Sequence, residues 1–215
     1  MLNFELLLFL IKCSYFIYKM SKNENDEIEV KAILIGDIGV GKTNLINVST
    51  GHKFNPQERT TITSNFVRKK FEIDSQKYCV NLWDTAGQEA LKSVTKIFFK
   101  GSDIVIFVYD ITNKKTLDSL EKWVDDADNI LENEHISGIV GNKKDLYIDE
   151  KVKEETVRQY AESKNMKFKL VSAKEDPEGF VDFLQELLND AKPFLIKRKK
   201  IELKNGHKNS NKCKC

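Results

Sequence analysis

The feature that most constrains the fold is a glycine-rich segment, Gly36-Asp-Ile-Gly-Val-Gly-Lys42-Thr43, which stands between an apolar run and an amphipathic stretch. The residues before it, 28–36, have the apolar, β-branched pattern of a buried strand, and residues 42–50 have helical spacing. A strand that passes through a glycine loop directly into a helix is typical of a β-α-β unit. The chain is therefore expected to fold around a parallel sheet.

The rest of the chain continues the alternation of strands and helices. Residues 64–74 and 77–84 are predicted to form a hairpin around the turn Asp74-Ser75-Gln76. Six strands in all predict an α/β fold, with a six-stranded, mostly parallel sheet, helices on both faces and ligands at the carboxyl ends of the strands. The further predicted strands are 103–110, 136–142 and 167–172, and the further predicted helices are 116–131, 152–164 and 178–191.

The segment 36–43 matches the phosphate-loop pattern G-x-x-x-x-G-K-[ST] in the strand-to-helix context that the pattern requires. The backbone N–H groups of Gly39, Val40 and Gly41 are expected to wrap around phosphates, helped by the positive end of the helix that follows. Lys42 is expected to reach the β- and γ-phosphates, and the Thr43 hydroxyl to bind Mg²⁺. The motif indicates a nucleotide but does not say which base.

A second segment, WDTAGQE at residues 83–89, follows the second strand of the predicted hairpin. Asp84, leaving a strand end beside the phosphate loop, can hold Mg²⁺ through water. Gly87 lets a backbone N–H approach the γ-phosphate, and the Gln88 side chain can orient an attacking water molecule. The alternative interpretation is an ordinary turn between a strand and a loop.

A third segment, GNKKD at residues 141–145, follows the buried strand 136–142. The carboxylate of Asp145 can accept hydrogen bonds from both N1–H and the exocyclic amino group of guanine. Adenine lacks that pair of donors, so the carboxylate would discriminate between the two bases. Asn142 and Lys143 complete the candidate base-binding set.

A fourth segment, Ser172-Ala173-Lys174, ends the last predicted strand, where a backbone N–H could meet O6 of guanine. On its own this tripeptide is a weak signal. Its place after the three earlier segments, in the same order along the chain, makes it corroborating.

These segments together resemble the small GTPases of the Ras superfamily, and most of all the Rab family, over residues 28–192. The resemblance implies hydrolysis of GTP to GDP and phosphate with Mg²⁺, and catalytic roles for Lys42 and Gln88. It implies that Thr61 is the switch I threonine that closes on Mg²⁺ and the γ-phosphate. It also implies that Phe54 packs on the guanine, although Phe54 could instead be an ordinary core or loop aromatic.

The resemblance further implies a molecular switch in vesicle and membrane trafficking. Its expected partners are effectors that bind switches I and II in the GTP state, an exchange factor, a GTPase-activating protein, a GDP-dissociation inhibitor and the prenylation machinery. Geranylgeranylation of Cys213 and Cys215 would place the protein on the cytoplasmic face of endomembranes, cycling with the cytosol.

Three departures from the Rab pattern lie on surfaces that read the nucleotide state. Ile38 occupies a phosphate-loop position that is usually small, and a branched side chain there is expected to slow hydrolysis, unless it turns outward harmlessly. Thr63, in switch I, replaces a glycine, and Ala90-Leu91, in switch II, replaces Arg-Phe. The alternatives to a normal switch are a slow-hydrolysing, GTP-bound scaffold and a phosphotransferase of the kinase type, which the 141–145 segment disfavours.

Residues 193–215 are predicted to be a disordered basic tail that ends in Cys-x-Cys. Residues 192–215 hold nine of the 35 Lys and Arg residues and one of the 33 acids, a net charge of +8, which leaves −6 for the rest. The basic run at residues 197–200 could be a nuclear-localisation or RNA patch or a solvated face. Beside two terminal cysteines it favours an anionic membrane surface, and the acidic body disfavours nucleic acid.

Residues 1–27 are predicted to be an apolar extension followed by a polar linker. The apolar stretch 1–18 is interrupted by Glu5 and Lys12, and it lacks the basic start and cleavage site of a signal peptide. Three interpretations stay open: a start codon upstream of the native one, an additional helix in contact with a membrane, and a signal anchor. Cys79, inside an apolar run, is expected to be a buried, inert thiol.

Overall fold

The computed structural model describes residues 27–59, 61, 65–85, 98–131 and 134–210. The strands form a single six-stranded sheet in the order β2-β3-β1-β4-β5-β6, in which β2 runs antiparallel to β3 and every other pair is parallel. The predicted six-stranded, mostly parallel sheet is confirmed. The strands are β1 (Ile28–Ile35), β2 (Asn65–Ile73), β3 (Gln76–Asp84), β4 (Ile104–Asp110), β5 (Ile136–Asn142) and β6 (Lys167–Leu170).

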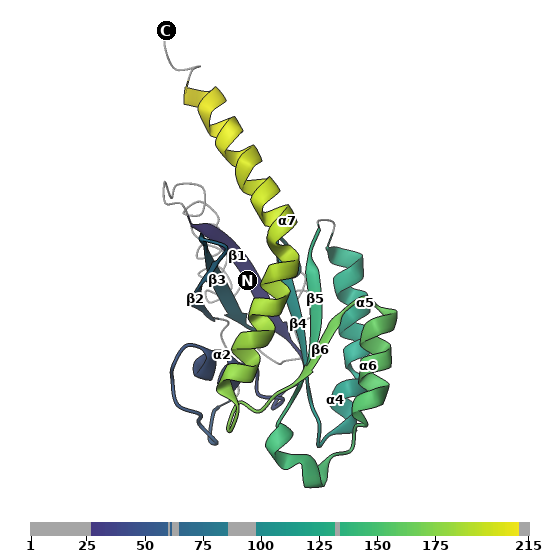
Figure 1. Ribbon diagram of the computed structural model, residues 1–215. Coiled ribbons are helices and arrows are strands. Elements are labelled where there is room, and N and C mark those ends of the chain that lie inside the picture. The colour runs from purple at the N-terminus through teal and green to yellow at the C-terminus, as the bar shows by residue number, and fades with distance from the viewer. Residues whose placement is uncertain (1–26, 60, 62–64, 86–97, 132–133, 211–215) are drawn as a thin grey trace, which may run out of the picture.

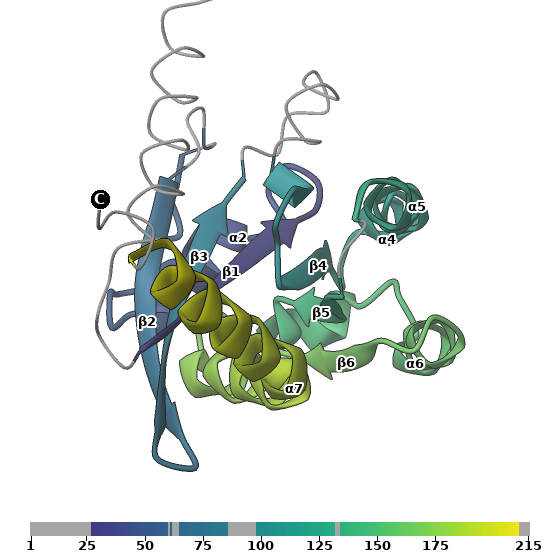
Figure 2. The same ribbon diagram turned by 90° about the horizontal axis from the view of Figure 1, so that it is seen from above.

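Helices cover both faces of the sheet, as predicted, and each face has its own apolar core (Figures 1 and 2). Alternate residues of β1 serve the two cores: Val30, Ala32 and Leu34 pack with α2 and α7, and Ile33 and Ile35 pack with α5 and α6. This two-sided burial explains the continuous apolar run in the sequence. The helices are α2 (Lys42–Ser49), α4 (Lys114–Asp118), α5 (Leu120–Ile130), α6 (Glu154–Ser163) and α7 (Pro177–Ser210), with the 3₁₀ helix η2 (Lys144–Asp149).

The parallel pairing brings the candidate functional segments to one edge of the sheet. Strands β1, β3, β5 and β6 run in the same direction, so the residues that follow them meet at their carboxyl ends, at the lower edge in Figure 1. The carboxyl end of α7 lies at the opposite pole. The fold therefore separates the candidate site from the basic part of the chain.

The β2–β3 hairpin forms at the predicted turn but with a tighter loop. Gln76 belongs to β3 and pairs with Ile73, which leaves two loop residues, Asp74 and Ser75. Both have left-handed backbone, with φ of 51° and 62°. Two consecutive left-handed residues match the right-handed twist of the strands they join, which is why short polar residues stand there.

The helix predicted at residues 116–131 differs in the structure. It begins at Lys114, because the side chain of Asn113 accepts the backbone N–H of Lys115 at 3.2 Å. It is then interrupted at Ser119, whose hydroxyl donates to the Lys115 carbonyl at 3.0 Å and competes with the regular backbone pattern. Strand β6 also ends two residues earlier than predicted.

The prediction of a disordered tail from residue 193 is wrong for the part of the tail that α7 includes, because the helix continues to Ser210. The apolar residues of α7 that face the core continue past Pro193. Leu195 is fully buried among the residues that cover β1. Arg198 then forms an ion pair with the buried Asp103 and donates to the Glu29 carbonyl at 2.9 Å. These contacts hold the helix past the proline, which removes one backbone N–H and crowds the carbonyl of the preceding turn.

No helix among the described residues is both long and apolar enough to cross a bilayer. The apolar stretch 1–18 and the terminal cysteines Cys213 and Cys215 lie outside the described residues. The three interpretations of the N-terminal stretch therefore stay open.

Replacing Leu195 with alanine tests the packing of α7 beyond Pro193. Because Leu195 is fully buried, Leu195→Ala should lower the free energy of unfolding by about 2–4 kcal/mol, measured by chemical denaturation at a fixed, saturating nucleotide concentration. Ile201→Ala is the control, because Ile201 lies in the same helix and is 50% exposed. Equal effects of the two substitutions would contradict the observed packing.

Candidate functional site

The loop between β1 and α2 needs glycine at two positions for different reasons. A side chain at Gly36 would stand 2.1 Å from the Val108 carbonyl oxygen of the neighbouring strand β4. Gly41 has a φ of +97°, and a side chain there would meet the Asn142 amide at 2.3 Å. The glycines of the motif thus let the loop approach β4 and the end of β5 closely.

Lys42 begins α2, and its side chain folds back over this loop. Its Nζ donates to the carbonyl oxygens of Gly36 at 2.8 Å and Asp37 at 2.9 Å. Burial lowers the pKa of the Lys42 ammonium to about 8, against the opposing influence of the nearby Asp84 and Asp37 carboxylates. The loop therefore holds a desolvated ammonium that an additional anion would stabilise.

The three predicted metal ligands, Thr43, Thr61 and Asp84, bring their oxygen atoms together in a triangle with two hydrogen bonds to Asp84. Asp84 Oδ2 accepts from the Thr43 hydroxyl at 2.8 Å and from the Thr61 hydroxyl at 3.0 Å, and the two hydroxyls lie 2.9 Å apart. Burial raises the pKa of the Asp84 carboxyl above its ordinary value, although both hydroxyl bonds and Lys42 oppose this.

The chemistry of this triangle fits Mg²⁺. Two hydroxyls and a carboxylate supply only oxygen atoms, which are the ligands that a hard divalent cation prefers. The second carboxylate oxygen of Asp84, Oδ1, is buried and has no hydrogen-bond partner within the described part of the chain. A buried acceptor of this kind normally has a partner, such as a cation or a water molecule held by one.

The Asn142 side chain joins two of the predicted segments. Its Nδ2 donates to the Val40 carbonyl at 2.8 Å, and its Oδ1 accepts the backbone N–H of Ala173 at 3.2 Å. Lys143, which follows with left-handed backbone, forms an ion pair with Asp110 at 2.7 Å. Asn142 therefore fixes the glycine loop against the segment after β6, independently of any ligand.

Ser172 forms hydrogen bonds within the last predicted segment and orients the Asp145 carboxylate. Its hydroxyl donates to Asp145 Oδ1 at 2.6 Å and accepts the backbone N–H groups of Lys174 at 3.2 Å and Glu175 at 3.0 Å. The Lys174 ammonium stands 3.7 Å from Asp145 Oδ2. One carboxylate oxygen of Asp145 thus accepts a hydrogen bond from the protein, and the other faces an ammonium.

Most of these groups line a cavity of about 530 Å³, a size that suits a small-molecule ligand, whereas Val40, Asp84 and Ser172 lie behind the lining residues. Phe54, half-buried against the core, contributes an aromatic wall, and Ile38 lines the cavity while being 52% exposed. The other predicted residues on the lining are Gly39, Gly41, Lys42, Thr43, Thr61, Asn142, Lys143, Asp145, Ala173 and Lys174. Gly87, Gln88, Thr63, Ala90 and Leu91 lie outside the described residues.

The sequence analysis missed two side chains that support the site. Asp110 ends β4 and holds Lys143, and the available signal was a carboxylate at the carboxyl end of a parallel strand. Trp123 of α5 donates from its indole N–H to Asp37 Oδ1 at 3.3 Å. Nothing in the local sequence signals this contact, because the two residues are 86 positions apart.

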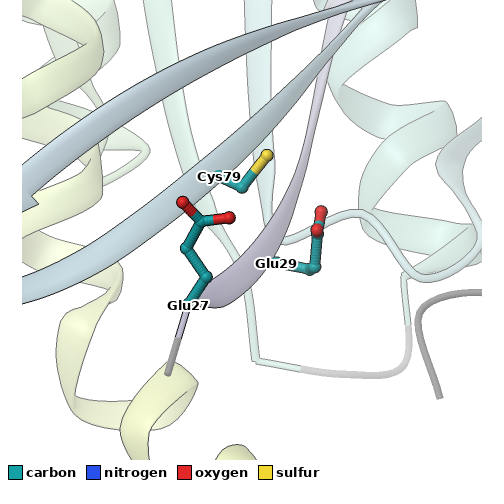
Figure 3. Close-up of side chains that lie close together, drawn as sticks. All are labelled: Glu27, Glu29 and Cys79. Atoms are coloured by element: carbon teal, nitrogen blue, oxygen red, sulfur yellow. The ribbon is translucent and has the colours of Figure 1, made fainter. Parts of the chain in front are cut away.

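A separate group of Glu27, Glu29 and Cys79 lies at the far end of β1 and β3, away from the cavity (Figure 3). The Glu27 carboxylate pairs with Lys70 at 2.8 Å, and Glu29 accepts from the Asn81 amide at 2.7 Å. Burial raises the pKa of the Cys79 thiol to about 11, so it stays protonated at neutral pH. Cys79 is buried as predicted, and the carboxylates already have partners.

Comparisons with known proteins agree with this geometry. The family model described as "Ras family" matches residues 31–192. Rab-7a of Paramecium octaurelia is 40% identical over 150 residues, covering 67% of this chain and 73% of the relative. Human Rab-30 is 33% identical over 172 residues, covering 79% and 85%, and Rab-11C of Dictyostelium discoideum is 31% identical over 183 residues, covering 82% of each.

The fold and the cavity define a phosphate-loop nucleotide-binding protein. The matches to known proteins identify the family within that class. The chain belongs to the Rab family of small GTPases, within the Ras superfamily. Members of this class bind guanine nucleotide with Mg²⁺ and hydrolyse GTP, so the protein is a GTP-binding switch.

The lowered pKa of Lys42 gives a test of the phosphate loop. Near pH 8 the free protein is about half protonated at Lys42, and phosphate binding should favour the charged form, so GDP binding should take up about half a proton. The part of the uptake that goes to Lys42, which is the difference from a variant without a titrating group there, should fall toward zero at pH 6.5, where the ammonium is already charged. Calorimetry in two buffers of different ionisation enthalpy measures the uptake.

The control for proton uptake is Lys42→Arg, whose guanidinium stays charged over this whole pH range. If the arginine variant takes up as many protons as the wild type, the proton does not go to Lys42. A wild type with no uptake at pH 8 would also contradict the assignment.

Proposed function

We propose that this protein is a Rab-type switch in membrane trafficking that holds guanine nucleotide and Mg²⁺ in the cavity described above. The observation that carries the proposal is the hydrogen-bonded triangle of Thr43, Thr61 and Asp84. It joins the start of α2, the end of β3 and the loop that precedes β2. Three segments distant in sequence thus converge on one set of oxygen donors, as a switch that responds to a metal-bound phosphate requires.

The phosphates are assigned to the glycine loop. The backbone N–H groups of Gly39, Val40 and Gly41 and the positive end of α2 face the anion, and Lys42 turns from the loop carbonyls toward it. Thr43, Thr61 and, through water, Asp84 would hold Mg²⁺, which supplies charge neutralisation for the terminal phosphates when it is bound.

The base is assigned to the opposite end of the cavity. Asp145 is held by Ser172 at 2.6 Å and can accept both N1–H and the amino group of guanine, with Ala173 and Lys174 beside it. Phe54 supplies an apolar face for stacking. Asn142 and Lys143 keep the base-binding segments in place through Val40 and Asp110.

The assignment of Asp145 predicts a change of base preference. Asp145→Asn should weaken GDP binding by about 100-fold or more, because an amide cannot accept from both guanine donors. The variant should gain binding of xanthosine diphosphate, which carries an oxygen in place of the amino group and can accept from the amide introduced at this position. Titration of both nucleotides measures the two effects.

The matched control for this change of preference is Asp118→Asn, because Asp118 makes an exposed ion pair with Lys114 on the surface. It should leave both affinities unchanged. A loss of GDP binding in Asp145→Asn without any gain for the xanthine nucleotide would argue that Asp145 is structural.

Hydrolysis is assigned to Gln88 and Lys42. The Gln88 side chain would orient the attacking water, Gly87 would offer a backbone N–H to the γ-phosphate, and the Lys42 ammonium would stabilise charge on the transferring phosphoryl group. Loss of the γ-phosphate would release Thr61 and Gly87, so that both switches relax. Partner proteins would read this difference.

A second candidate function is a slow-hydrolysing scaffold that stays in the GTP form. Its support is Ile38, a branched apolar side chain that lines the cavity and is 52% exposed at the phosphate loop. From there it can obstruct the water or the catalytic residue of an activating protein. The scaffold and the switch would bind the nucleotide with the same residues and would differ only in the rate of GTP hydrolysis.

The substitution Ile38→Ser tests whether Ile38 slows GTP hydrolysis. If Ile38 obstructs hydrolysis, the serine variant should hydrolyse GTP about fivefold faster in a single turnover, which corresponds to about 1 kcal/mol of barrier. GDP affinity should change little and serves as the internal control. Equal rates for wild type and variant would show that the side chain turns outward harmlessly.

The nucleotide found in the purified protein tests the whole proposal. Chromatography of the released nucleotide should give GDP for a switch and GTP for the slow scaffold. Adenine nucleotide would refute both.

Protein partners are proposed to bind at the two switches and the residues beside them. Phe66 of β2, Trp83 of β3 and Phe98 form an aromatic row, with ring centres 5.0 and 6.4 Å apart, in which Trp83 and Phe98 are buried and Phe66 is partly exposed. Effectors of the GTP state would meet the partly exposed Phe66 and the two switches beside it. An exchange factor, a GTPase-activating protein, a GDP-dissociation inhibitor and the prenylation machinery complete the proposed set, without nucleic acid.

Membrane attachment is proposed at the other pole. The basic residues of α7 and two prenyl groups on Cys213 and Cys215 would bind the anionic cytoplasmic face of endomembranes, with return to the cytosol between cycles. The support is the placement of the carboxyl end of α7 far from the cavity (Figure 1). Effectors and membrane would then not compete for one surface.

A further inference from the structure

The Asn44 side chain makes an unusual pair of contacts with the loop that follows α2. Its Nδ2 donates to the Asn55 carbonyl oxygen at 2.9 Å, and its Oδ1 accepts the backbone N–H of Asn55 at 2.9 Å. Asn44 is only 8% exposed, and it directly follows Thr43 in the first turn of α2. A single amide group thus satisfies both backbone polar groups of one loop residue.

The residue held in this way begins a stiff turn. The Asn55 carbonyl also accepts the Glu58 N–H at 3.2 Å, and the Asn55 side chain accepts the Gln57 N–H at 3.0 Å. Its amide donates to the Glu58 carboxylate at 3.2 Å, and Pro56, with fixed φ, stands at the second position. Movement of Asn55 would therefore carry the whole turn with it.

This turn lies between the two ligand-binding residues of the loop. Phe54 precedes the fixed residue directly, and Thr61 follows the turn at the triangle with Thr43 and Asp84. Phe54 is half-buried against the core and lines the cavity, as do Pro56 and Glu58. The backbone position of Asn55 sets where the Phe54 ring can stand.

We propose that Asn44 is a positioning residue for the guanine base: its side chain clamps the backbone of Asn55, which keeps Phe54 at the cavity wall and slows nucleotide release. The inference rests on the proposed placement of the base against Phe54. The side chain itself needs no contact with the nucleotide. Three consecutive residues of α2 then have separate tasks, Lys42 for phosphate, Thr43 for the metal site and Asn44 for the base-side loop.

The two hydrogen bonds set the expected size of the effect. Without the amide, the Asn55 N–H loses its partner and its carbonyl keeps only the turn contact, so the loop can leave α2. Two bonds of ordinary strength correspond to about tenfold or more in a dissociation rate constant. Release of GDP should be faster, and association should change little because the cavity is still open to solvent.

The experiment is a double-mutant cycle on the rate of GDP release, measured with a fluorescent GDP chased by unlabelled GDP in the full chain. Asn44→Ala should accelerate release by about tenfold in the wild-type background and by less than about twofold in the Phe54→Ala background. Asn47→Ala is the matched control, because Asn47 lies one turn further along α2 and its side chain has no hydrogen bond among the described contacts.

Each outcome decides the proposal. Equal acceleration in both backgrounds would show that Asn44 acts through general stability, and no acceleration would show that the clamp does not restrain the base; either result overturns the inference. If Asn44→Ala does not fold, Asn44→Ser takes its place in the same cycle. A wild type that does not bind the fluorescent GDP would instead refute the proposed function.

Discussion

The burial of two opposite charges at the carboxyl edge of the sheet is the constraint on which the rest of the structure depends. Lys42 and Asp84 are both desolvated, and burial moves their pKa values in opposite directions, down for the ammonium and up for the carboxyl. Two loop carbonyls and two hydroxyls partly compensate that cost. Parallel pairing of β1 with β3 and β4 brings these groups to one place.

The sequence could predict those parts of the fold and site in which the residue type and the chemistry are closely linked. Glycine loops, an apolar run buried on two sides and polar residues at strand ends each have a local signature, and the sheet and the roles of Thr43 and Asp84 follow from them, whereas Thr61 was predicted from the resemblance to the Rab family. The bridging roles of Asn142 and Asp110 could not be predicted, because they depend on contacts between strands distant in sequence. The Asn44 clamp has the same origin.

The carboxyl-terminal tail shows why a prediction from local composition was wrong. A basic segment with few apolar residues after Ile201 has the local signature of disorder, and this signature suggested that the helix ends near residue 192. Tertiary contacts prevail over it, since Leu195 is buried in the core and Arg198 meets a buried carboxylate. Local composition cannot report such contacts. The roles of Gly87, Gln88 and the terminal cysteines remain predictions, because these residues lie outside the described part of the chain.

The long α7 helix has a mechanical consequence. At about 1.5 Å per residue, its 34 residues extend over about 50 Å, and its first half is fixed along the sheet. A segment of that kind acts as a strut and not as a slack tether. With the proposed membrane attachment at its carboxyl end, the helix would hold the nucleotide site at a distance from the lipid surface, where large partners could reach it.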